Sequence, residues 1–293
     1  MIRFTKMHGL GNDYVYVDCF EQDLGGVDVP ALARAMSDRH RGIGSDGLIL
    51  IRPPSRAGHR DEVGHARMEM YNADGSRGEM CGNGIRCVAK YLVDRGLVSC
   101  GTGDRRELKI VTDRGTLSLW AMLRDGRVHS VRVDMGVPIL RPSEIPVTAP
   151  GERCVRRPVD VAGRLLELTC VSMGNPHAVA FVDDIQAVDL KRLGPLVERN
   201  PVFPNRTNFH IVRVATRQSA WMRTWERGSG VTMACGTGAC AVLVAGVLDG
   251  RLDRRALLHL PGGELEVEWP DVAGGSVFMT GPAVEVFSGQ WPT

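Results

Sequence analysis

Two cysteines, Cys81 and Cys235, open near-copies of one short motif. The first copy reads CGNG and the second CGTG, and a run of apolar, helix-forming residues follows each of them. The start of a helix offers unpaired backbone N–H groups and a partial positive charge, which bind anions and favour a thiolate over a thiol. A thiol duplicated at a duplicated anion site suggests two halves of the chain that face one substrate.

Two opposed thiols can invert a carbon stereocentre. One thiolate removes a proton from the carbon and a thiol on the opposite face delivers another, which is general acid–base catalysis at suitable geometry and pKa. The N–H groups at the helix starts would hold an α-carboxylate and stabilise the charge that develops when the α-proton leaves. The motif pair therefore predicts an enzyme that inverts an α-carbon.

No other electron sink is evident in the sequence. None of the lysines stands in a convincing cofactor-anchoring context (Lys6, Lys90, Lys109 and Lys191). The cysteines form no Cys-x-x-Cys pair and no Cys/His cluster with zinc spacing. We therefore expect neither a cofactor nor a metal. The remaining isolated cysteines are interpreted as small buried or half-buried hydrophobic residues (Cys19, Cys100, Cys154 and Cys170).

The bulk composition limits the class of protein. A chain of 293 residues exceeds one typical core, which favours two domains. A hydrophobic share of 43% and a charged share of 24% are ordinary for a globular protein. Because the net charge is only +2 and basic clusters are short, we expect no nucleic-acid partner. With no apolar signal region and no apolar run that could span a bilayer, we expect a cytoplasmic protein without a membrane partner.

Short strand patterns, separated by turn residues, dominate the chain. We expect strands at 2–6, 14–20, 47–51, 67–71, 108–111, 116–122 and 128–135, and then at 166–172, 178–182, 209–215, 220–225, 256–260, 264–269 and 277–280. Helices are expected at 30–38, 83–95, 190–199 and 237–249, and a surface hairpin loop at 55–65. Strands, a Cys-led helix and strands occur twice in this order. The order predicts an α+β fold with two similar mixed-sheet domains, each wrapped around a helix.

Polar residues beside glycine and proline form a second layer of candidates. Taken singly, an Asn in such a loop is typical of a turn, His177 is typical of a structural histidine, and Glu226 with Arg227 is typical of a surface ion pair. Their repetition beside two thiol motifs favours a binding role, because amides and an arginine can grip the polar far end of an amino acid. The amide candidates are Asn12, Asn72, Asn175 and Asn208.

The chain resembles the diaminopimelate epimerases, a family of cofactor-independent enzymes with two catalytic cysteines. The shared stretches run in the family's order along almost the whole chain. They are KMHGLGND (6–13), RHRGIGSDG (39–47), YNADGS (71–76), MCGNGIRC (80–87), SMGNPH (172–177), ERGSG (226–230), ACGTGACA (234–241) and LPGG (260–263). Together these stretches are highly specific, whereas none of them would be so alone.

The resemblance implies a fold, an activity and an assembly. It implies two pseudo-symmetric domains, each a mixed β-sheet or barrel wrapped around a central helix, with the active site in the cleft between them. We expect residues 1–127 with 282–293 to form the first domain and residues 128–281 to form the second. The implied reaction is the interconversion of LL- and meso-2,6-diaminoheptanedioate in lysine and peptidoglycan-precursor biosynthesis. The implied assembly is a homodimer.

The same resemblance implies roles for individual residues. Cys81 and Cys235 are similar to the family's two acid/base thiols, and His177 and Glu226 resemble residues that assist the thiol proton transfers. The backbone cradle for the α-carboxylate corresponds to Gly82, Asn83, Gly236 and Thr237. The substrate pocket corresponds to Asn12, Asn72, Asn175, Asn208, Glu226 and Arg227, with Arg227 and the amides at the distal end.

Two positions depart from the family's pattern. At the position of Gly47 some members carry a Gln that contacts substrate, and at the position of Val231 many carry a Glu. Glycine removes the glutamine side chain, and valine alters the support of the loop before the second cysteine.

Three other functions stay open from the residues alone. A cofactor-independent racemase of another amino acid could use the same fold and thiols, although the amides and Arg227 favour a long substrate with a charged far end. A thiol redox sensor could join its two thiols reversibly, but the amide-rich loops would then have no purpose. A cysteine phosphatase is disfavoured because Arg86 stands one residue too close to Cys81 for that family's Cys-x5-Arg pattern.

Overall fold

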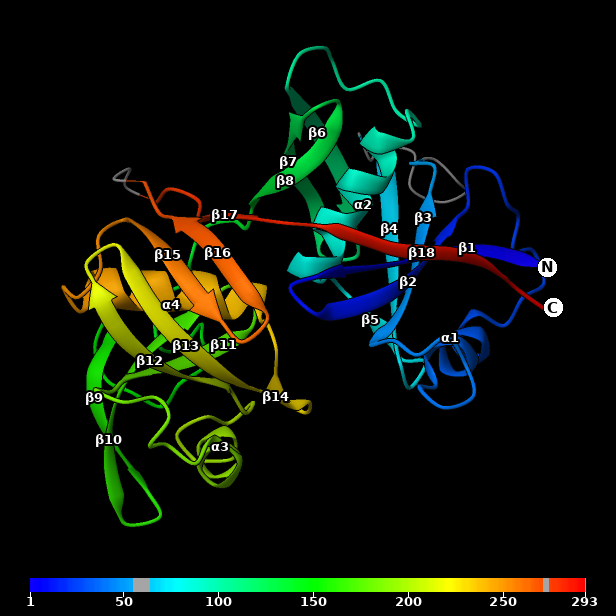
Figure 1. Ribbon diagram of the computed structural model, residues 1–293. Helices are drawn as coiled ribbons and strands as arrows, with labels where there is room; N and C mark the ends of the chain where they lie inside the picture. The colour runs from blue at the N-terminus through cyan, green and yellow to red at the C-terminus, as the bar shows by residue number, and fades with distance from the viewer. Residues whose placement is uncertain (55–63, 271–273, 293) are drawn as a thin grey trace. The chain divides into compact units, whose positions relative to one another are not determined.

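A computed structural model describes residues 1–54, 64–270 and 274–292 of the chain (Figure 1). Most of the hairpin loop expected at 55–65 lies outside the described residues. The chain divides into two compact units. Unit 1 is Met1–Val133 together with Gly281–Thr293, and unit 2 is Asp134–Thr280. The domain boundaries expected from the sequence, at 127/128 and 281/282, stay a prediction.

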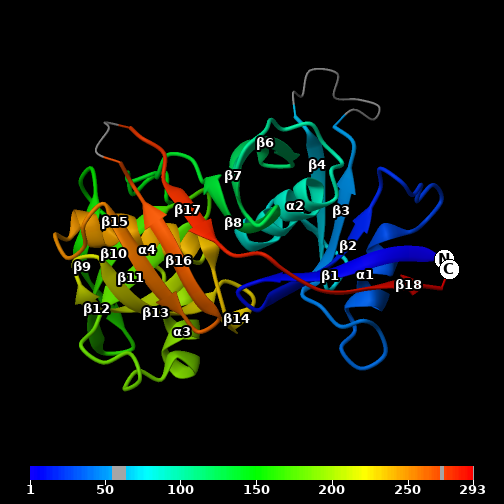
Figure 2. The same cartoon turned by 45° about the horizontal axis from the view of Figure 1, so that its top comes forward.

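Unit 1 is a mixed sheet between two helices. Its elements are β1 (Ile2–Gly9), β2 (Asn12–Asp18), α1 (Val29–Ser37), β3 (Gly47–Arg52), β4 (Ala66–Asn72), β5 (Arg77–Gly78), α2 (Gly82–Asp94), β6 (Arg105–Thr112), β7 (Gly115–Arg124), β8 (Arg127–Asp134) and β18 (Val284–Trp291). The last strand of the chain pairs with the first, so that the two termini lie side by side in Figures 1 and 2. The sheet runs from β18 through β1, β2, β3, β4 and β6 to β7 and β8, and only the β2–β3 and β4–β6 pairs are parallel.

Side chains alternate between the two faces of the sheet in unit 1, so that α1 packs on one face and α2 on the other. Val15, Val17 and Leu48 pack in one core cluster with Leu32 and Met36 of α1. The residues between them point to the opposite face, where the hydroxyl of Tyr16 donates to the carbonyl of Gly84 in α2 at 3.2 Å. Helix α2 is therefore buried over most of its length, and it ends before Gly96, which has a φ of 63°.

Unit 2 has the same construction. Its elements are β9 (Cys154–Val161), β10 (Arg164–Ser172), β11 (Pro176–Phe181), α3 (Leu190–Glu198), β12 (Asn208–Thr216), β13 (Ser219–Glu226), β14 (Gly230–Thr232), α4 (Gly236–Leu248), β15 (Arg255–Leu260), β16 (Gly263–Glu268) and β17 (Phe278–Gly281). Phe209 and Ile211 pack with Leu190 and Val197 of α3 in one core cluster. Helix α4 covers the other face, is apolar on all sides and is almost wholly buried.

The two units repeat one strand order. In unit 2 the sheet runs from β9 through β10, β11, β12, β13 and β15 to β16 and β17, and only the β11–β12 and β13–β15 pairs are parallel. Strand for strand this is the pattern of unit 1, with the short strands β5 and β14 and the helices α2 and α4 at matching places. The prediction of an α+β fold with two similar mixed sheets, each with a central helix, is confirmed.

The registers of the strands make individual residues equivalent. In unit 1 Ile49 of β3 lies opposite Tyr16 of β2 and Met70 of β4. In unit 2 His210 of β12 lies opposite Val179 of β11 and Thr224 of β13. Counting from these partners, Asn12 matches Asn175, Tyr14 matches His177, Asn72 matches Glu226 and Cys81 matches Cys235. Both cysteines and several of the other predicted site residues thus occupy equivalent places in the two units.

Most elements lie where the strand and helix patterns predict them, with ends that differ by a few residues. The four predicted helices are present as α1 to α4, and the predicted strands are all present. Among the strands of the described residues, four carry no prediction: β5, β9, β14 and β18. In β9, two arginines and Pro158 confine the alternation to Val159–Val161, and every residue of β18 is at least partly exposed. Neither strand therefore shows, over its length, the alternation on which the prediction depends.

Candidate active site

Cys81 lies at the start of α2, as its motif predicts. It is the N-cap residue, with an extended backbone (φ −128°, ψ 118°), and its sulfur accepts a hydrogen bond from the backbone N–H of Gly84 at 3.3 Å. A Cβ on Gly84 would come within 2.7 Å of the Ile49 side chain, so the glycine lets the first turn pack directly on β3. The side chain of Cys81 is partly exposed.

Asn12 orients its amide toward Cys81. Its Oδ1 accepts from the sulfur of Cys81 at 3.3 Å and from the Nδ2 of Asn83 at 3.4 Å. Its Nδ2 donates to Asp46 at 2.6 Å, which fixes which end of the amide faces the thiol. Burial first, and then the charge of Cys81, raise the pKa of Tyr14 well above its ordinary value.

A charged network holds Asp46 behind Asn12. Asp46 accepts from the backbone N–H of Asp13 at 3.0 Å, and Arg39 bridges the two carboxylates at 2.8 Å each. Lys6 forms an ion pair with Asp13 from the buried side. Burial and the neighbouring charge of Asp13 raise the pKa of Asp46, whereas the two cations lower that of Asp13 against its own burial.

Asn72 is linked to Asp46 through the backbone of the next residue, Ala73. Its Nδ2 donates to the hydroxyl of Ser76 at 2.9 Å across a tight turn, and the backbone N–H of Ala73 donates to the carbonyl of Asp46 at 3.1 Å. Gly47 lies opposite Asn72, and a Cβ there would come within 2.1 Å of the Tyr71 carbonyl oxygen. This backbone leaves no room for the glutamine that some family members carry. Cys81, Gly82, Asn83, Asn12 and Asn72 form the Cys81 cluster.

Cys235 occupies the equivalent N-cap of α4 (φ −120°, ψ 108°) in a more enclosed setting. Only 5% of its surface is exposed, and its sulfur lies 3.6 Å from the hydroxyl of Thr237. Burial first, and then the charge of Glu226, raise the pKa of the Cys235 thiol well above its ordinary value. Glu226 ends β13, and its Oε1 accepts from the hydroxyl of Thr232 at 2.5 Å.

His177 lies behind this thiol in a fully buried pair of rings. Its Nε2 is 2.9 Å from Oδ1 of Asn175, and its Nδ1 is 2.9 Å from Nε2 of His210. The Nδ2 of Asn175 donates in turn to the Thr237 hydroxyl at 3.4 Å. Burial lowers the pKa of His210 to about 3, so that this ring is neutral at physiological pH.

Arg227 and Asn208 join this set through the backbone. The Oδ1 of Asn208 accepts from the N–H of Arg227 at 2.9 Å, and its Nδ2 donates to the Pro176 carbonyl at 2.9 Å. The guanidinium of Arg227 is exposed and donates to the carbonyl of Asn205 at 2.9 Å. Cys235, Gly236, Thr237, Asn175, His177, Asn208, Glu226 and Arg227 form the Cys235 cluster.

The surroundings include residues that the sequence prediction lacks, among them Tyr14, Asp46, Thr232 and His210. Asp46 lies inside a stretch shared with the family, which could have marked it. His210 stands between the buried apolar residues Phe209 and Ile211, and a histidine at the centre of a buried strand is a signal in its own right. Tyr14 and Thr232 carry no comparable signal in the sequence. Val231, the second departure from the family's pattern, lies on β14 with 42% of its surface exposed.

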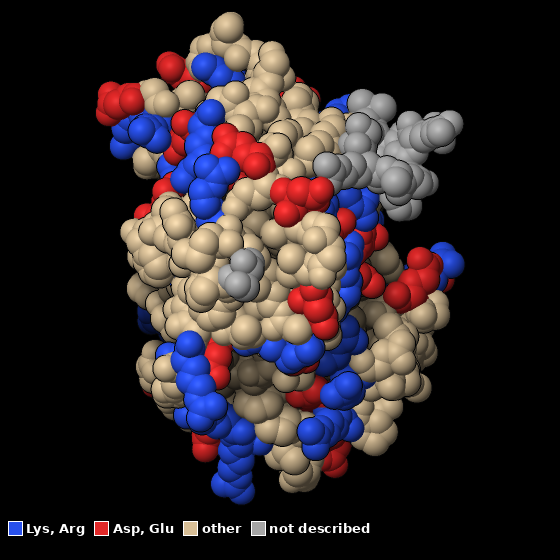
Figure 3. Space-filling view, turned by 90° about the vertical axis from the view of Figure 1, so that its right-hand side faces the viewer, with Lys and Arg blue, Asp and Glu red and all other residues tan. Residues whose placement is uncertain are grey.

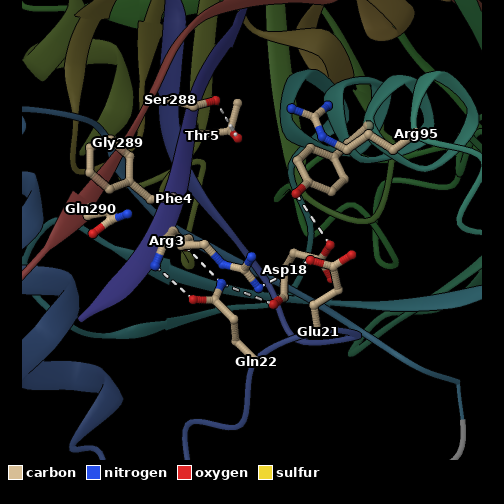
Figure 4. Close-up of a pocket in the computed structure, with 11 residues that line it drawn as sticks. Arg3, Phe4, Thr5, Asp18, Glu21, Gln22, Arg95, Ser288, Gly289 and Gln290 are labelled. Atoms are coloured by element: carbon tan, nitrogen blue, oxygen red, sulfur yellow. Dashed lines mark hydrogen bonds and ion pairs between the residues drawn. The ribbon is translucent and has the colours of Figure 1, made fainter.

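A cavity of about 400 Å³ in unit 1 contains none of the predicted site residues (Figure 4). It lies between β1, β18 and the end of α2, and its polar groups bond to one another. The hydroxyls of Thr5 and Ser288 are 3.1 Å apart, and the hydroxyl of Tyr91 donates to Asp18 at 3.3 Å. This cavity therefore offers no chemistry that resembles that of the two thiols.

Among the residues that the structure describes, no three His, Cys, Asp or Glu side chains gather in a way that could hold a metal ion. Within the same ranges, no helix combines the length and apolarity needed to cross a membrane. On the face shown in Figure 3, Lys and Arg side chains are interspersed with Asp and Glu.

The cysteines outside the two motifs lie where the sequence analysis expects them. Cys19, Cys154 and Cys170 are buried and Cys100 is partly buried, which confirms their interpretation as small buried or half-buried hydrophobic residues.

Comparisons with known proteins agree closely with one another. The family model described as diaminopimelate epimerase matches residues 4–140 and 169–286. The chain is 49% identical over 291 residues to a diaminopimelate epimerase of Pelotomaculum thermopropionicum, covering 99% of each chain. It is likewise 49% identical over 290 residues to that of Acetivibrio thermocellus, covering 99% of this chain and 98% of the relative.

Solved structures show the same fold at low sequence identity. A probable proline racemase from Agrobacterium radiobacter, solved with bound carbonate, has a TM-score of 0.68 at 18% identity and covers 100% of this chain and 93% of its own. A phenazine biosynthesis protein of the PhzF family from Bacillus anthracis has a TM-score of 0.65 at 16% identity, covering 100% and 99%. At these identities the likeness concerns the fold alone.

Proposed function

The chain belongs to the diaminopimelate epimerase family, and we propose that it interconverts LL- and meso-2,6-diaminoheptanedioate with two thiols and no cofactor. It is an isomerase. The observation that carries the proposed mechanism is the pair of cysteines, each at the N-cap of a buried central helix in equivalent units.

The proposed reaction moves two protons at one carbon. The Cys81 thiol, which donates to Asn12 in the free protein, first gives its proton to solvent. The resulting thiolate takes the α-proton, and the C–H electron pair stays on the α-carbon and spreads into its carboxylate. The Cys235 thiol gives its proton to the opposite face, which leaves a Cys235 thiolate and an inverted centre. The raised pKa of Cys235 supports this assignment in the free enzyme, because a thiol with a high pKa keeps its proton at neutral pH. In the reverse direction the two thiols exchange roles.

Backbone dipoles take the place of an electron sink in this proposal. The first turns of α2 and α4 begin at Gly82 and Gly236, and helix starts carry N–H groups and partial positive charge. These groups would bind the α-carboxylate and stabilise the extra charge of the carbanion, as preorganised dipoles do at an oxyanion. The N–H groups of Asn83 and Thr237 lie in the same first turns and complete the proposed cradle.

The distal amino-carboxylate end is assigned to amides and one cation. The exposed guanidinium of Arg227 can bind a carboxylate through two N–H groups, and its backbone is fixed by Asn208. Asn12, Asn72 and Asn175 supply further donors and acceptors. A compact ring such as that of proline has no charged far end for Arg227, so the long substrate is preferred.

Glu226 and His177 receive different roles from their contacts. Glu226 is the charged neighbour of the Cys235 thiol, and we assign it to assist that proton transfer directly. His177 bonds to Asn175 and His210, so we assign its effect on Cys235 to the orientation of Asn175.

We also propose that the enzyme works as a homodimer in the cytoplasm. Strand β18 leaves Val284, Val286 and Phe287 exposed by 41, 54 and 47%, and a second copy of the chain would cover such an edge. Sedimentation equilibrium tests the dimer, with Phe287→Lys as the variant expected to dissociate it and the exposed Leu165→Lys as control. A native chain that sediments as a monomer would contradict the assembly, and cell fractionation tests the location.

A panel of amino acids tests the proposed activity. The reduced enzyme is incubated with LL-2,6-diaminoheptanedioate, L-proline, trans-4-hydroxy-L-proline, L-glutamate and L-lysine, and the stereoisomers are separated by chiral chromatography. We expect conversion of the first compound only. Turnover of another amino acid without turnover of diaminoheptanedioate would contradict the proposal, and hydrolysis of a phosphate ester would point to a phosphatase.

A further inference from the structure

A row of hydrogen bonds crosses the interior of unit 2 and ends at the thiol. It begins on β13, passes through β12 and β11, and reaches the first turn of α4. Its members in order are Thr224, His210, His177, Asn175, Thr237 and Cys235, joined by distances of 3.0, 2.9, 2.9, 3.4 and 3.6 Å. Thr224, His210 and His177 are at most 2% exposed, so this end of the row is shielded from water.

The amide of Asn175 shows the direction of the row. Its NH₂ group donates to Thr237, so its oxygen faces His177 and can only accept. His177 must therefore carry a proton on Nε2, and in the neutral ring Nδ1 is then an acceptor. The proton between the two rings belongs to Nε2 of His210, whose own Nδ1 accepts from the Thr224 hydroxyl. Every donor in the row then has one acceptor.

The direction has a consequence at the thiol. The Thr237 oxygen accepts from Asn175, so its own hydroxyl proton is free to point at the sulfur of Cys235. A donor aimed at sulfur stabilises the thiolate that remains after Cys235 has given up its proton. Burial and Glu226 act in the opposite sense on the same group.

In unit 1 the position equivalent to His210 is occupied by Ile49, which cannot form such a row of hydrogen bonds. A Cβ on Gly84 of α2 would meet Ile49, and a Cβ on the matching Gly238 of α4 would meet the ring of His210 at 2.4 Å. The strand partner of Ile49 is Met70, whereas that of His210 is Thr224. The fold therefore accepts an apolar pair at this layer, and the polar pair in unit 2 is not required for packing.

We propose that His210 is a positioning residue for the epimerisation: held by Thr224, it fixes His177 in the Nε2–H tautomer and, through Asn175, keeps the Thr237 hydroxyl proton directed at Cys235. This inference rests on the proposed function for its kinetic test only. The tautomer of His177 is a property of the free protein and can be measured without substrate.

The first test is the tautomer of His177 in the free protein. Long-range ¹H–¹⁵N NMR distinguishes Nε2–H from Nδ1–H histidine, and His177→Gln assigns the signal. We expect the Nε2–H form in the native protein at pH 7 and a mixture of tautomers in Thr224→Val, which removes the hydroxyl with little change of shape. A native His177 in the Nδ1–H form, or an unchanged pure Nε2–H signal in Thr224→Val, would overturn the proposal.

The second test is kinetic, and unit 1 supplies the variant. His210→Ile introduces the residue that occupies the equivalent position beside Gly84, and His210→Gln restores a donor near the former Nε2. We expect kcat to fall roughly 10-fold in His210→Ile with KM within about twofold, and to recover at least half of that loss in His210→Gln. His259→Gln serves as the matched control, since its ring also bonds through both nitrogens, to Ser219 and Glu264, but lies outside the row. It should leave kcat unchanged.

The outcomes separate this inference from the proposed activity. If the native enzyme does not epimerise diaminoheptanedioate, the proposed function fails while the NMR result still decides the role of His210. If the native enzyme is active and His210→Ile keeps its kcat, the positioning role fails alone. Should His210→Ile not fold, Thr224→Val takes its place, with an expected fall in kcat of about threefold and a fall of less than 1.5-fold counting against the role.

Discussion

The Cys81 and Cys235 clusters share one backbone and differ in what surrounds it. Both thiols cap buried helices, and both helices carry a glycine at the same place in the first turn. Behind Cys81 lie an apolar layer with Ile49 and a charged network that ends in Arg39 and Lys6. Behind Cys235 lie Glu226 and the neutral row through His210. In the proposed mechanism the repeated part binds the α-carboxylate, and the different part sets which thiol holds the proton.

The largest effects should follow removal of either thiol. Cys81→Ala and Cys235→Ala should each lower kcat at least about 10³-fold, because in the proposed mechanism each thiol alone serves one face of the substrate. Cys87→Ala and Cys240→Ala are the controls, one on each helix; both residues are fully buried, and each variant should keep kcat within about threefold. Steady-state assays from both stereoisomers measure this. A single alanine variant with near-native kcat would break the equivalence of the clusters.

Glu226→Gln should bring the reactivity of the Cys235 thiol closer to that of the Cys81 thiol. The charge of Glu226 adds to burial in raising the pKa of Cys235, so its removal should lower that pKa and speed alkylation of Cys235 at pH 8. We also expect kcat to fall roughly 30-fold, since a group that assists proton transfer is lost. Peptide mass spectrometry after iodoacetamide treatment gives the rate at each cysteine. In the native protein Cys81 should react before Cys235, and the reverse order would contradict the assigned protonation.

Asp46→Asn should lower the activity through the Cys81 cluster and leave the Cys235 cluster unchanged. The carboxylate of Asp46 holds the Nδ2 of Asn12, and an amide in its place lets Asn12 turn its oxygen away from the Cys81 thiol. That thiol then loses the acceptor that aligns it as the proton donor of the proposed meso-to-LL direction. We expect a fall in kcat of about tenfold, the scale of one hydrogen bond, with the alkylation of Cys235 unchanged. Asp184→Asn is a suitable control, because Asp184 likewise accepts a backbone N–H, from Gln186, outside both clusters. An equal loss in the control would remove the special role of Asp46.

Acid should destabilise the fold through His210, whose equivalent in unit 1, Ile49, cannot take up a proton. Its folded pKa of about 3 lies below the ordinary value of 6.5, so below pH 6.5 the unfolded chain binds a proton that the folded chain refuses. This group therefore lowers the free energy of unfolding by up to about 1.4 kcal/mol per pH unit as pH falls, until the folded pKa is reached. Urea unfolding at pH 7, 6 and 5 should show a smaller pH dependence in His210→Gln. An identical pH dependence would contradict the buried neutral ring.

The sequence predicts the common part of the two clusters better than their difference. A glycine-flanked cysteine before an apolar run is a local pattern, and both helices begin at the residue that follows the cysteine. The contact of Asn12 with Asp46 and that of His177 with His210 join strands far apart in the chain, and no local rule encodes them. Strand β18 is missed for a related reason, since an exposed strand lacks the alternation that burial imposes.

Isotope incorporation at low conversion tests the central claim, that two different thiols serve the two faces of one carbon. The enzyme converts LL-2,6-diaminoheptanedioate in D₂O, and both stereoisomers are analysed at low conversion by mass spectrometry. The account predicts deuterium at the inverted carbon of the newly formed meso compound while the recovered LL compound still carries protium. Equal early labelling of both compounds would show one shared base and would contradict it.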